Sequence, residues 1–349
     1  MKYNYLESFR GLMALWVVLL HGFGFLPLLP KNFLTDFFYN GYLPVVAFII
    51  LSGFVTHILL DKGEIFTRYI IRRAFRLFPI YLVALGISIF ALNFSLDILT
   101  QLPFENPNIK TRIKLIETAF NDHFWINIIS HVLLLHGVFP DNKYPFTYTL
   151  MGQSWSLTLE WQFYLFIPFI WKYFKEKNIL SVIPLILMMP LIVYSHLHMP
   201  QKSFLPYMIQ YFLIGYIAYY FFKMYLETGK YYVFYFLSLV TLGLCFIDFQ
   251  ISIMIAIFSM VLLMQANHKF HKIFSSKFLI DLGKISYSMY CIHLIVFYIV
   301  IFILLKFNIE DPLLFSVLTI TSGTIFTIVF SKFSFRHIEK PLMDFAKKI

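Results

Sequence analysis

Long apolar runs are the feature that most limits what this chain can fold into. The stretch from Ile285 to Leu305 contains no Lys, Arg, Asp or Glu. An apolar stretch of this length is far too long for a buried strand. About 20 apolar residues cross the hydrocarbon core of a bilayer as a helix, because a helix satisfies its own backbone hydrogen bonds there. We therefore predict an all-α protein, a polytopic transmembrane helical bundle.

Composition agrees with a membrane protein. Hydrophobic residues make up 60% of the 349 positions and charged residues only 13%, whereas a soluble domain carries roughly a quarter charged residues. No small-residue cleavage site follows the first apolar run, so we expect a retained first helix. Cys245 and Cys291 both lie within apolar runs, which favours neither a disulfide framework nor a metal site.

The apolar runs divide into about ten predicted spans. They cover residues 9–29, 38–60, 77–95, 151–174, 179–197, 205–226, 231–249, 250–266, 285–305 and 312–335. The apolar segment 126–139 is short, and we interpret it as interfacial, re-entrant or packed over the bundle. If it crossed the membrane, the orientation of every later helix would be reversed.

The cations are distributed unevenly between the two sides. With a cytoplasmic N-terminus, 21 of the 28 Lys and Arg residues fall in cytoplasmic segments. This bias predicts that both termini are cytoplasmic and that the protein is in the inner (cytoplasmic) membrane. It indicates that the cations behind the net charge of +10 face the cytoplasmic membrane surface and do not bind nucleic acid. The longest non-spanning stretch, about 96–150, is expected to be an extracytoplasmic loop.

Arg10 and His21 lie eleven residues apart in the first predicted span. That spacing is close to three helical turns, or about 16 Å, so both side chains are expected on one face. With Arg10 at the cytoplasmic interface, His21 lies near the middle of the membrane, where a neutral imidazole can act as a base. Alternatively, Arg10 anchors the helix at the membrane interface and His21 is a structural histidine.

Glu160 is an acidic residue well inside a predicted span. Gln153, Ser156, Glu160 and Tyr164 share one helix face at helical spacing. Such a polar stripe is expected to face the bundle interior or a water-filled cavity. Glu160 is therefore a candidate to orient a catalytic histidine or to position a substrate hydroxyl, the alternative being a paired structural carboxylate.

Arg73 and Arg76 are neighbours at i, i+3 at the start of the predicted third span, just before Pro79. Two adjacent guanidinium groups suit phosphate oxygens, although arginines at this place also anchor a helix to lipid headgroups. Gly53 in the second span is expected to allow close helix packing. The segment 282–293, which ends at His293, is interpreted as a packing feature.

Six motifs in order resemble the acyltransferase-3 family of membrane-bound O-acyltransferases. They are Leu6–Gly11 with Arg10-x10-His21, Phe48–Phe54, Arg72–Tyr81, Trp155–Tyr164, Leu282–His293 and Ile338–Pro341. The family commonly begins Leu-Asp-Gly-Leu-Arg-Gly, and Glu7-Ser8-Phe9 replaces the middle of that motif here. Many relatives carry a C-terminal esterase-like domain; we expect the stand-alone form, with residues 1–349 as one transmembrane acyltransferase domain.

The resemblance implies an acyl-CoA donor, most often acetyl-CoA, and an acceptor hydroxyl on a cell-surface glycan or its lipid-linked precursor. His21 and Glu160 are then the expected catalytic residues, and no metal is expected. Arg10, Arg73 and Arg76 are expected to bind the donor, and Ser156 and Tyr164 the acceptor. A covalent acyl-histidine remains an alternative route. The alternative functions are transfer of succinyl or another acyl group, and a transporter or flippase for a glycan intermediate.

Overall fold

The computed structural model describes residues 4–25, 32–102, 104, 106–119, 123–176, 182–264, 272–309 and 311–349. Within these ranges the regular structure is entirely helical, with no strand. The predicted all-α fold is confirmed.

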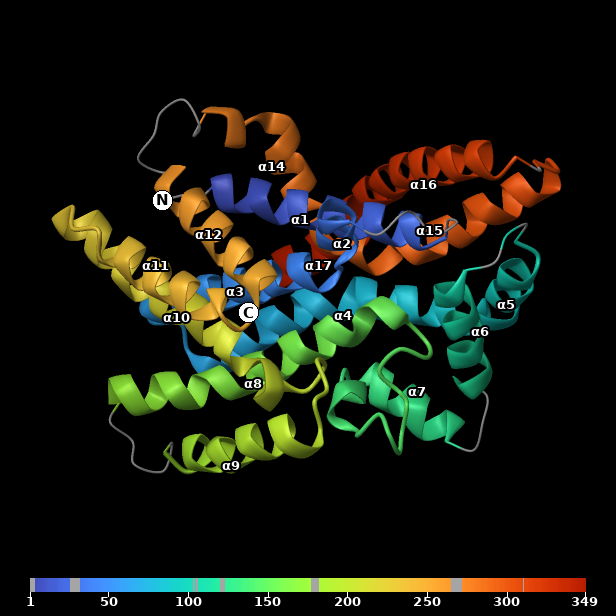
Figure 1. The fold of residues 1–349 in the computed structure, drawn as a ribbon. Coiled ribbons are helices and arrows are strands. Elements are labelled where there is room, and N and C mark those ends of the chain that lie inside the picture. Colours follow the sequence, from blue (N-terminus) through green and yellow to red (C-terminus); the bar gives the residue numbers. More distant parts are fainter. Residues whose placement is uncertain are drawn as a thin grey trace.

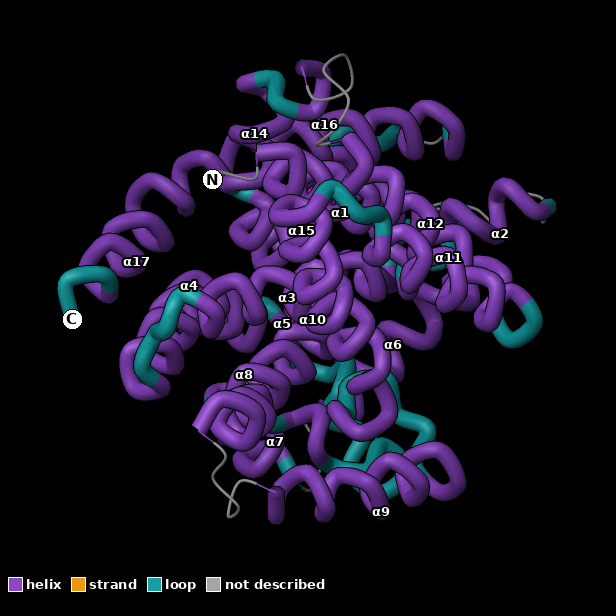
Figure 2. Tube along the Cα trace, turned by 90° about the vertical axis from the view of Figure 1, so that its left-hand side faces the viewer, coloured by secondary structure: helices purple, strands orange, loops and turns teal. Residues whose placement is uncertain are grey.

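A helix occupies each of the predicted segments. The long helices are α1 (Asn4–Gly24), α3 (Tyr42–Asp61), α4 (Phe66–Phe90), α8 (Trp155–Glu176), α9 (Val182–His198), α10 (Leu205–Thr228), α11 (Tyr232–Cys245), α12 (Phe249–Leu263), α15 (Ser286–Lys306) and α16 (Pro312–Ser334). The shorter ones are α2 (Phe33–Tyr39), α5 (Leu92–Thr100), α6 (Pro107–Ala119), α7 (Phe124–Val132), α14 (Lys277–Lys284) and α17 (Lys340–Ala346). Most of the long helices run along a common direction, with α5 and α6 at the end away from the N-terminus and α14 near the other end (Figures 1 and 2).

Five of the described helical segments are long and apolar enough to cross a membrane. They are α1, α3, α4, α15 and the continuous helical run Pro312–Ala346. α11 and α12 are apolar but shorter, with 14 and 15 residues, so each extends only about 22 Å. The chain is therefore a multi-pass membrane protein, while ten crossings and the cytoplasmic position of the termini stay predictions.

The helix that contains the predicted third span begins well before residue 77. α4 begins at Phe66 and continues through Pro79 to Phe90 as one helix of 25 residues. No Gly or Pro interrupts residues 66–78, and the apolar stems of long cationic side chains lie comfortably along a helix surface. Arg73 and Arg76 consequently project from the body of a long helix rather than from its first turn.

The segment 126–139 does not form an eleventh spanning helix. α7 has nine residues, about 14 Å of helix, which is half the thickness of the hydrocarbon core. Its polar residues Asn127 and His131 are buried, whereas Trp125 and Ile129 are exposed. The Tyr81 hydroxyl of α4 donates to the His131 carbonyl at 2.8 Å. The segment thus packs against the bundle, and whether it also lies at the membrane interface stays a prediction.

A buried pair of histidines connects this loop to the start of α8. The rings of His131 and His136 stack with centroids 4.0 Å apart, and His136 Nε2 lies 3.2 Å from the Ser154 hydroxyl. Burial lowers the pKa of His131 to about 4, an effect reinforced by Arg112 and opposed by the hydrogen bond to Asn127. Both rings are therefore neutral packing elements that position the first turn of α8.

α3 and α10 approach each other closely through two glycines. A Cβ at Gly53 would overlap the carbonyl oxygen of Phe212, and a Cβ at Gly215 would overlap that of Ile50. This confirms the role in close helix packing predicted for Gly53, because only a residue without a side chain lets two backbones come this near.

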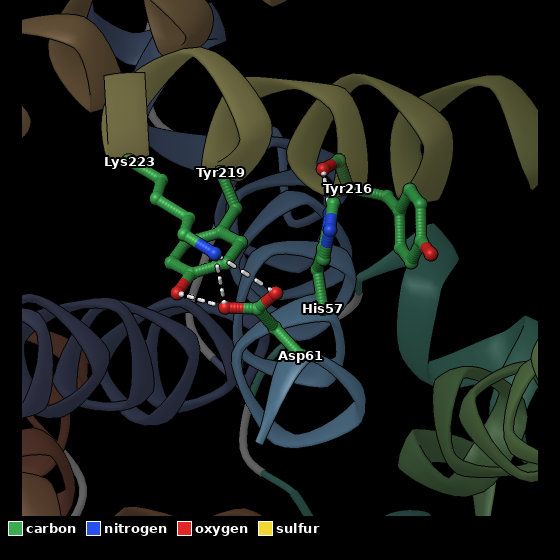
Figure 3. Close-up of polar contacts among 5 residues, drawn as sticks. All are labelled: His57, Asp61, Tyr216, Tyr219 and Lys223. Carbon is green, nitrogen blue, oxygen red and sulfur yellow. Dashed lines mark hydrogen bonds and ion pairs between the residues drawn. The ribbon is translucent and has the colours of Figure 1, made fainter. Parts of the chain in front are cut away.

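Side chains at the C-terminal ends of α3 and α10 complete this contact (Figure 3). His57 stacks on Tyr216 with ring centroids 4.0 Å apart and donates from Nδ1 to the Tyr216 carbonyl. Asp61 accepts from Lys223 Nζ at 2.9 and 3.1 Å and from the Tyr219 hydroxyl at 3.5 Å. The two helices therefore end at the same side of the bundle, as the predicted alternation of spans requires.

We expect Gly53→Ala to lower the melting temperature of the protein in detergent. The added methyl group forces the α3 and α10 backbones apart, and such overpacking typically destabilises by about 1–3 kcal/mol. Gly86→Ala in α4 is the matched control, because a Cβ there meets nothing within 4 Å and alanine favours a helix. Equal melting temperatures for the two variants would contradict the assigned packing.

Candidate functional site

Six of the seven predicted site residues line one pocket, which we call the central pocket. They are Arg10 of α1, Arg73 and Arg76 of α4, and Ser156, Glu160 and Tyr164 of α8. The pocket has about 690 Å³ of open space and also includes Ser52 of α3 and Tyr290 of α15. The polar stripe expected on α8 thus faces the bundle interior.

Glu160 accepts hydrogen bonds from hydroxyl groups on two helices. The Ser52 hydroxyl donates to Glu160 Oε1 at 2.7 Å, and the Tyr164 hydroxyl donates to the same oxygen. Arg10 of α1 and Arg73 and Arg76 of α4 line the same pocket. Glu160 is therefore held in a fixed orientation by Ser52 and Tyr164.

Arg73 lies over the aromatic wall of the pocket. Its guanidinium carbon is 4.6 Å from the centre of the Tyr164 ring and 5.4 Å from that of Tyr69, distances typical of cation–π contacts. The residue is 5% exposed, and Nη2 has no hydrogen-bond partner among the described residues. A buried donor of this kind is available to an oxygen atom of a ligand.

A larger cavity, which we call the basic pocket, adjoins the central pocket. It has about 1640 Å³ of open space and shares Arg10 and Arg76 with the central pocket. Its wall adds Lys277 and Lys284 around α14, and the acidic residues Glu7, Asp281 and Glu339. Arg10 is paired with Glu7 at 2.9 Å. The two pockets adjoin each other, because Arg10, Arg76 and Tyr287 line both.

His21 lies apart from the central pocket, at the contact between α1 and α15. Its ring centroid is 4.8 Å from that of His293, and its Nδ1 is 2.9 Å from the Val17 carbonyl oxygen. Because a carbonyl only accepts, Nδ1 carries the proton and Nε2 carries the lone pair of the neutral ring. The structure does not bring His21 and Glu160 together, since the hydrogen bonds to the Glu160 side chain come from Ser52 and Tyr164.

Tyr290 and His293 connect the central pocket to His21. Tyr290 lines the pocket, its hydroxyl lies 2.7 Å from the Ser156 hydroxyl, and it donates to the Gln153 carbonyl at 2.6 Å. The ring centroid of His293 is 6.1 Å from that of Tyr290. The rings of Tyr290, His293 and His21 thus form a row from the pocket wall to α1.

Sequence reasoning missed several residues of the site. Ser52 was overlooked beside Gly53, and Tyr290 and His293 were interpreted as packing residues although they lie in a resemblance motif. Glu339 was placed beyond the last span, yet it is 3% exposed and accepts from the Ser288 hydroxyl at 2.7 Å. The only signal for Glu339 was its place in the Ile338–Pro341 motif.

A family model described as an acyltransferase domain matches residues 3–332, nearly the whole chain. No curated protein and no solved structure shows significant similarity to the chain.

We expect a cysteine at position 52 to react readily with a small cationic methanethiosulfonate reagent, because Ser52 lines the central pocket. The experiment uses a Cys245→Ser background, since Cys245 is exposed and Cys291 is buried. Ala84→Cys is the control, because Ala84 is fully buried in α4 and lines none of these pockets. Labelling is measured by mass spectrometry; a rate at position 52 no faster than at position 84 would contradict an accessible pocket.

Proposed function

The chain belongs to the acyltransferase-3 family. We propose that it transfers an acyl group, in our proposal acetyl, from acyl-CoA to an acceptor hydroxyl. The acceptor is a cell-surface glycan or its lipid-linked precursor. The observation that carries this proposal is that the basic and central pockets adjoin, with Arg10 and Arg76 lining both. The cations of the basic pocket therefore lie beside a pocket that contains Glu160, a half-buried carboxylate.

The donor's size and charge fit these two pockets. The nucleotide phosphates of CoA lie in the basic pocket, where Arg10, Arg76, Lys277 and Lys284 provide positive charge. The pantetheine arm and the thioester extend into the central pocket beneath Arg73, whose free Nη2 donates to an oxygen of the donor. Guanidinium groups suit phosphate and carbonyl oxygens because they donate through a planar fork.

The transfer step takes place at the row of rings that ends on His21. The acceptor oxygen attacks the thioester carbonyl carbon, so that an O–C bond forms and the C–S bond breaks. The hydroxyl proton passes from the central pocket along the row of Tyr290, His293 and His21, is held on His21, and then moves to the sulfur of the departing CoA. Glu160 positions the acceptor hydroxyl, with Ser156 and Tyr164 beside it. The products are the acyl ester and CoA with a free thiol.

We expect His21→Ala to abolish acyl transfer while leaving the protein folded and inserted. Loss of a general base typically reduces the rate about 10²–10⁴-fold. Among the described residues, the hydrogen bond of the His21 side chain stays within α1, at the Val17 carbonyl, and its ring contact is with His293. The assay measures release of free CoA from acetyl-CoA with acceptor-bearing membranes present. Substantial activity in a variant that still elutes as a monodisperse peak would refute the assignment of His21.

Arg73→Lys is expected to raise the apparent KM for the acyl-CoA donor and to change kcat less. Lysine keeps the charge but replaces the planar fork that stacks on Tyr164 with a point charge. Arg72→Lys is the matched control, because Arg72 is paired with Glu64 outside the two pockets. Donor kinetics unchanged by Arg73→Lys would return Arg73 to the role of a membrane anchor.

A further inference from the structure

A third cavity is lined by residues of α4, α5, α6 and α15. α5 and α6 lie at the end of the bundle away from the N-terminus (Figure 1). We call this cavity the distal pocket. Its cavity volume is about 180 Å³. Its polar lining residues are Ser88, Ser95, Arg112, Gln153 and Tyr298, and the remaining wall is mostly apolar.

Arg112 is the charged residue of this pocket, and it has no carboxylate partner among the described residues. Its guanidinium donates to the Tyr148 carbonyl and, at 3.5 Å, to the Tyr298 hydroxyl. These contacts hold the group in place without neutralising its charge. A fixed, unneutralised guanidinium in a largely apolar cavity favours an anionic group such as a carboxylate or phosphate.

Gln153 supplies an unused acceptor in the same cavity. The residue is 2% exposed, and its Nε2 donates to the Cys291 carbonyl at 2.9 Å. This bond leaves the carbonyl oxygen Oε1 buried without a donor among the described residues. A buried acceptor without a partner is costly, and a ligand hydroxyl donating to Oε1 would remove that cost.

The distal pocket is separated from the central pocket by a thin polar layer. Gln153 lines the distal pocket and Ser156 lines the central one. The Tyr290 hydroxyl contacts both residues, donating to the Gln153 carbonyl and lying 2.7 Å from the Ser156 hydroxyl. The polar stripe that begins at Gln153 therefore connects the two cavities.

We propose that the distal pocket binds the acyl acceptor, and that this acceptor carries an anionic group beside its reactive hydroxyl. Arg112 binds the carboxylate or phosphate, and Gln153 accepts from a hydroxyl that points toward Tyr290 and the central pocket. Identifying the ligand as the acyl acceptor rests on the proposed acyl transfer. The anion-binding site itself rests on Arg112 and Gln153.

The test measures binding to the purified full-length protein in nanodiscs, with methyl β-D-glucuronide and methyl β-D-glucoside as a matched pair of probes. These sugars differ only by a carboxylate in place of a hydroxymethyl group. We expect the glucuronide to bind at least about tenfold more tightly, because hydrogen bonds to an ionised acceptor are roughly twice as strong as neutral ones. Equal binding of the two sugars would overturn the proposal.

Variants of the same protein locate the effect. Arg112→Gln should reduce the ratio of the two affinities to about one, and Lys114→Gln, an exposed change of the same charge on α6, should leave it unchanged. Ser88→Glu adds a carboxylate to the pocket while keeping the contacts of Arg112, and it too should abolish the preference. A ratio unaffected by both Arg112→Gln and Ser88→Glu would place the anion elsewhere and overturn the site.

Two further arms separate the possible conclusions. The first compares dodecyl β-D-glucuronide with the methyl glycoside. Tighter binding of the dodecyl compound would indicate an acceptor carried on a lipid, consistent with the exposed apolar residues Ile87, Phe94 and Ile299 of the lining. Equal binding would indicate a free sugar acid. Release of CoA from acetyl-CoA is measured in parallel. Glucuronide binding without CoA release would refute the acyl transfer and support the anion site. Faster CoA release with the glucoside than with the glucuronide would support the acyl transfer and refute the anion site.

Discussion

Charged side chains among apolar helices are the constraint on which the rest of this structure depends. A charged group at the centre of a bilayer costs about 2.5–3.5 kcal/mol on insertion scales, so it is retained only where other polar groups surround it. Here Arg73 lies on the Tyr164 ring, Tyr164 donates to Glu160, and Ser52 donates to the same carboxylate. The arrangement joins α3, α4 and α8, and it places the polar groups around a single pocket.

Close helix packing makes that convergence possible. α3 approaches α10 through Gly53 and Gly215, and α1 approaches α14 where Gly283 meets the backbone of Glu7. The first contact places Ser52 toward α8, and the second brings the lysines that flank α14 beside Arg10. Short-range packing between backbones thus determines which charges share a cavity, because membrane helices associate through shape rather than through hydrophobic burial.

The proposed chemistry uses the length of the bundle. A donor with phosphates occupies the end that contains the start of α1, and an acceptor enters from the end that contains α5 and α6. Tyr290, His293 and His21 lie between these spaces, on the seam of α15 with α1 and α8. A thin polar layer between two cavities keeps bulk water from the thioester while allowing one hydroxyl to reach it.

The sequence by itself determined the helical class, the location of the long helices and most of the polar residues that share the central pocket. Those features depend on apolar run length and on helical period, which are local properties. Only the tertiary structure decided that His21 pairs with His293 rather than with Glu160, that Glu339 is buried and that Arg112 faces a cavity. These are contacts between residues distant in the chain, and they follow from which helix faces pack together, for which a single sequence carries no direct signal.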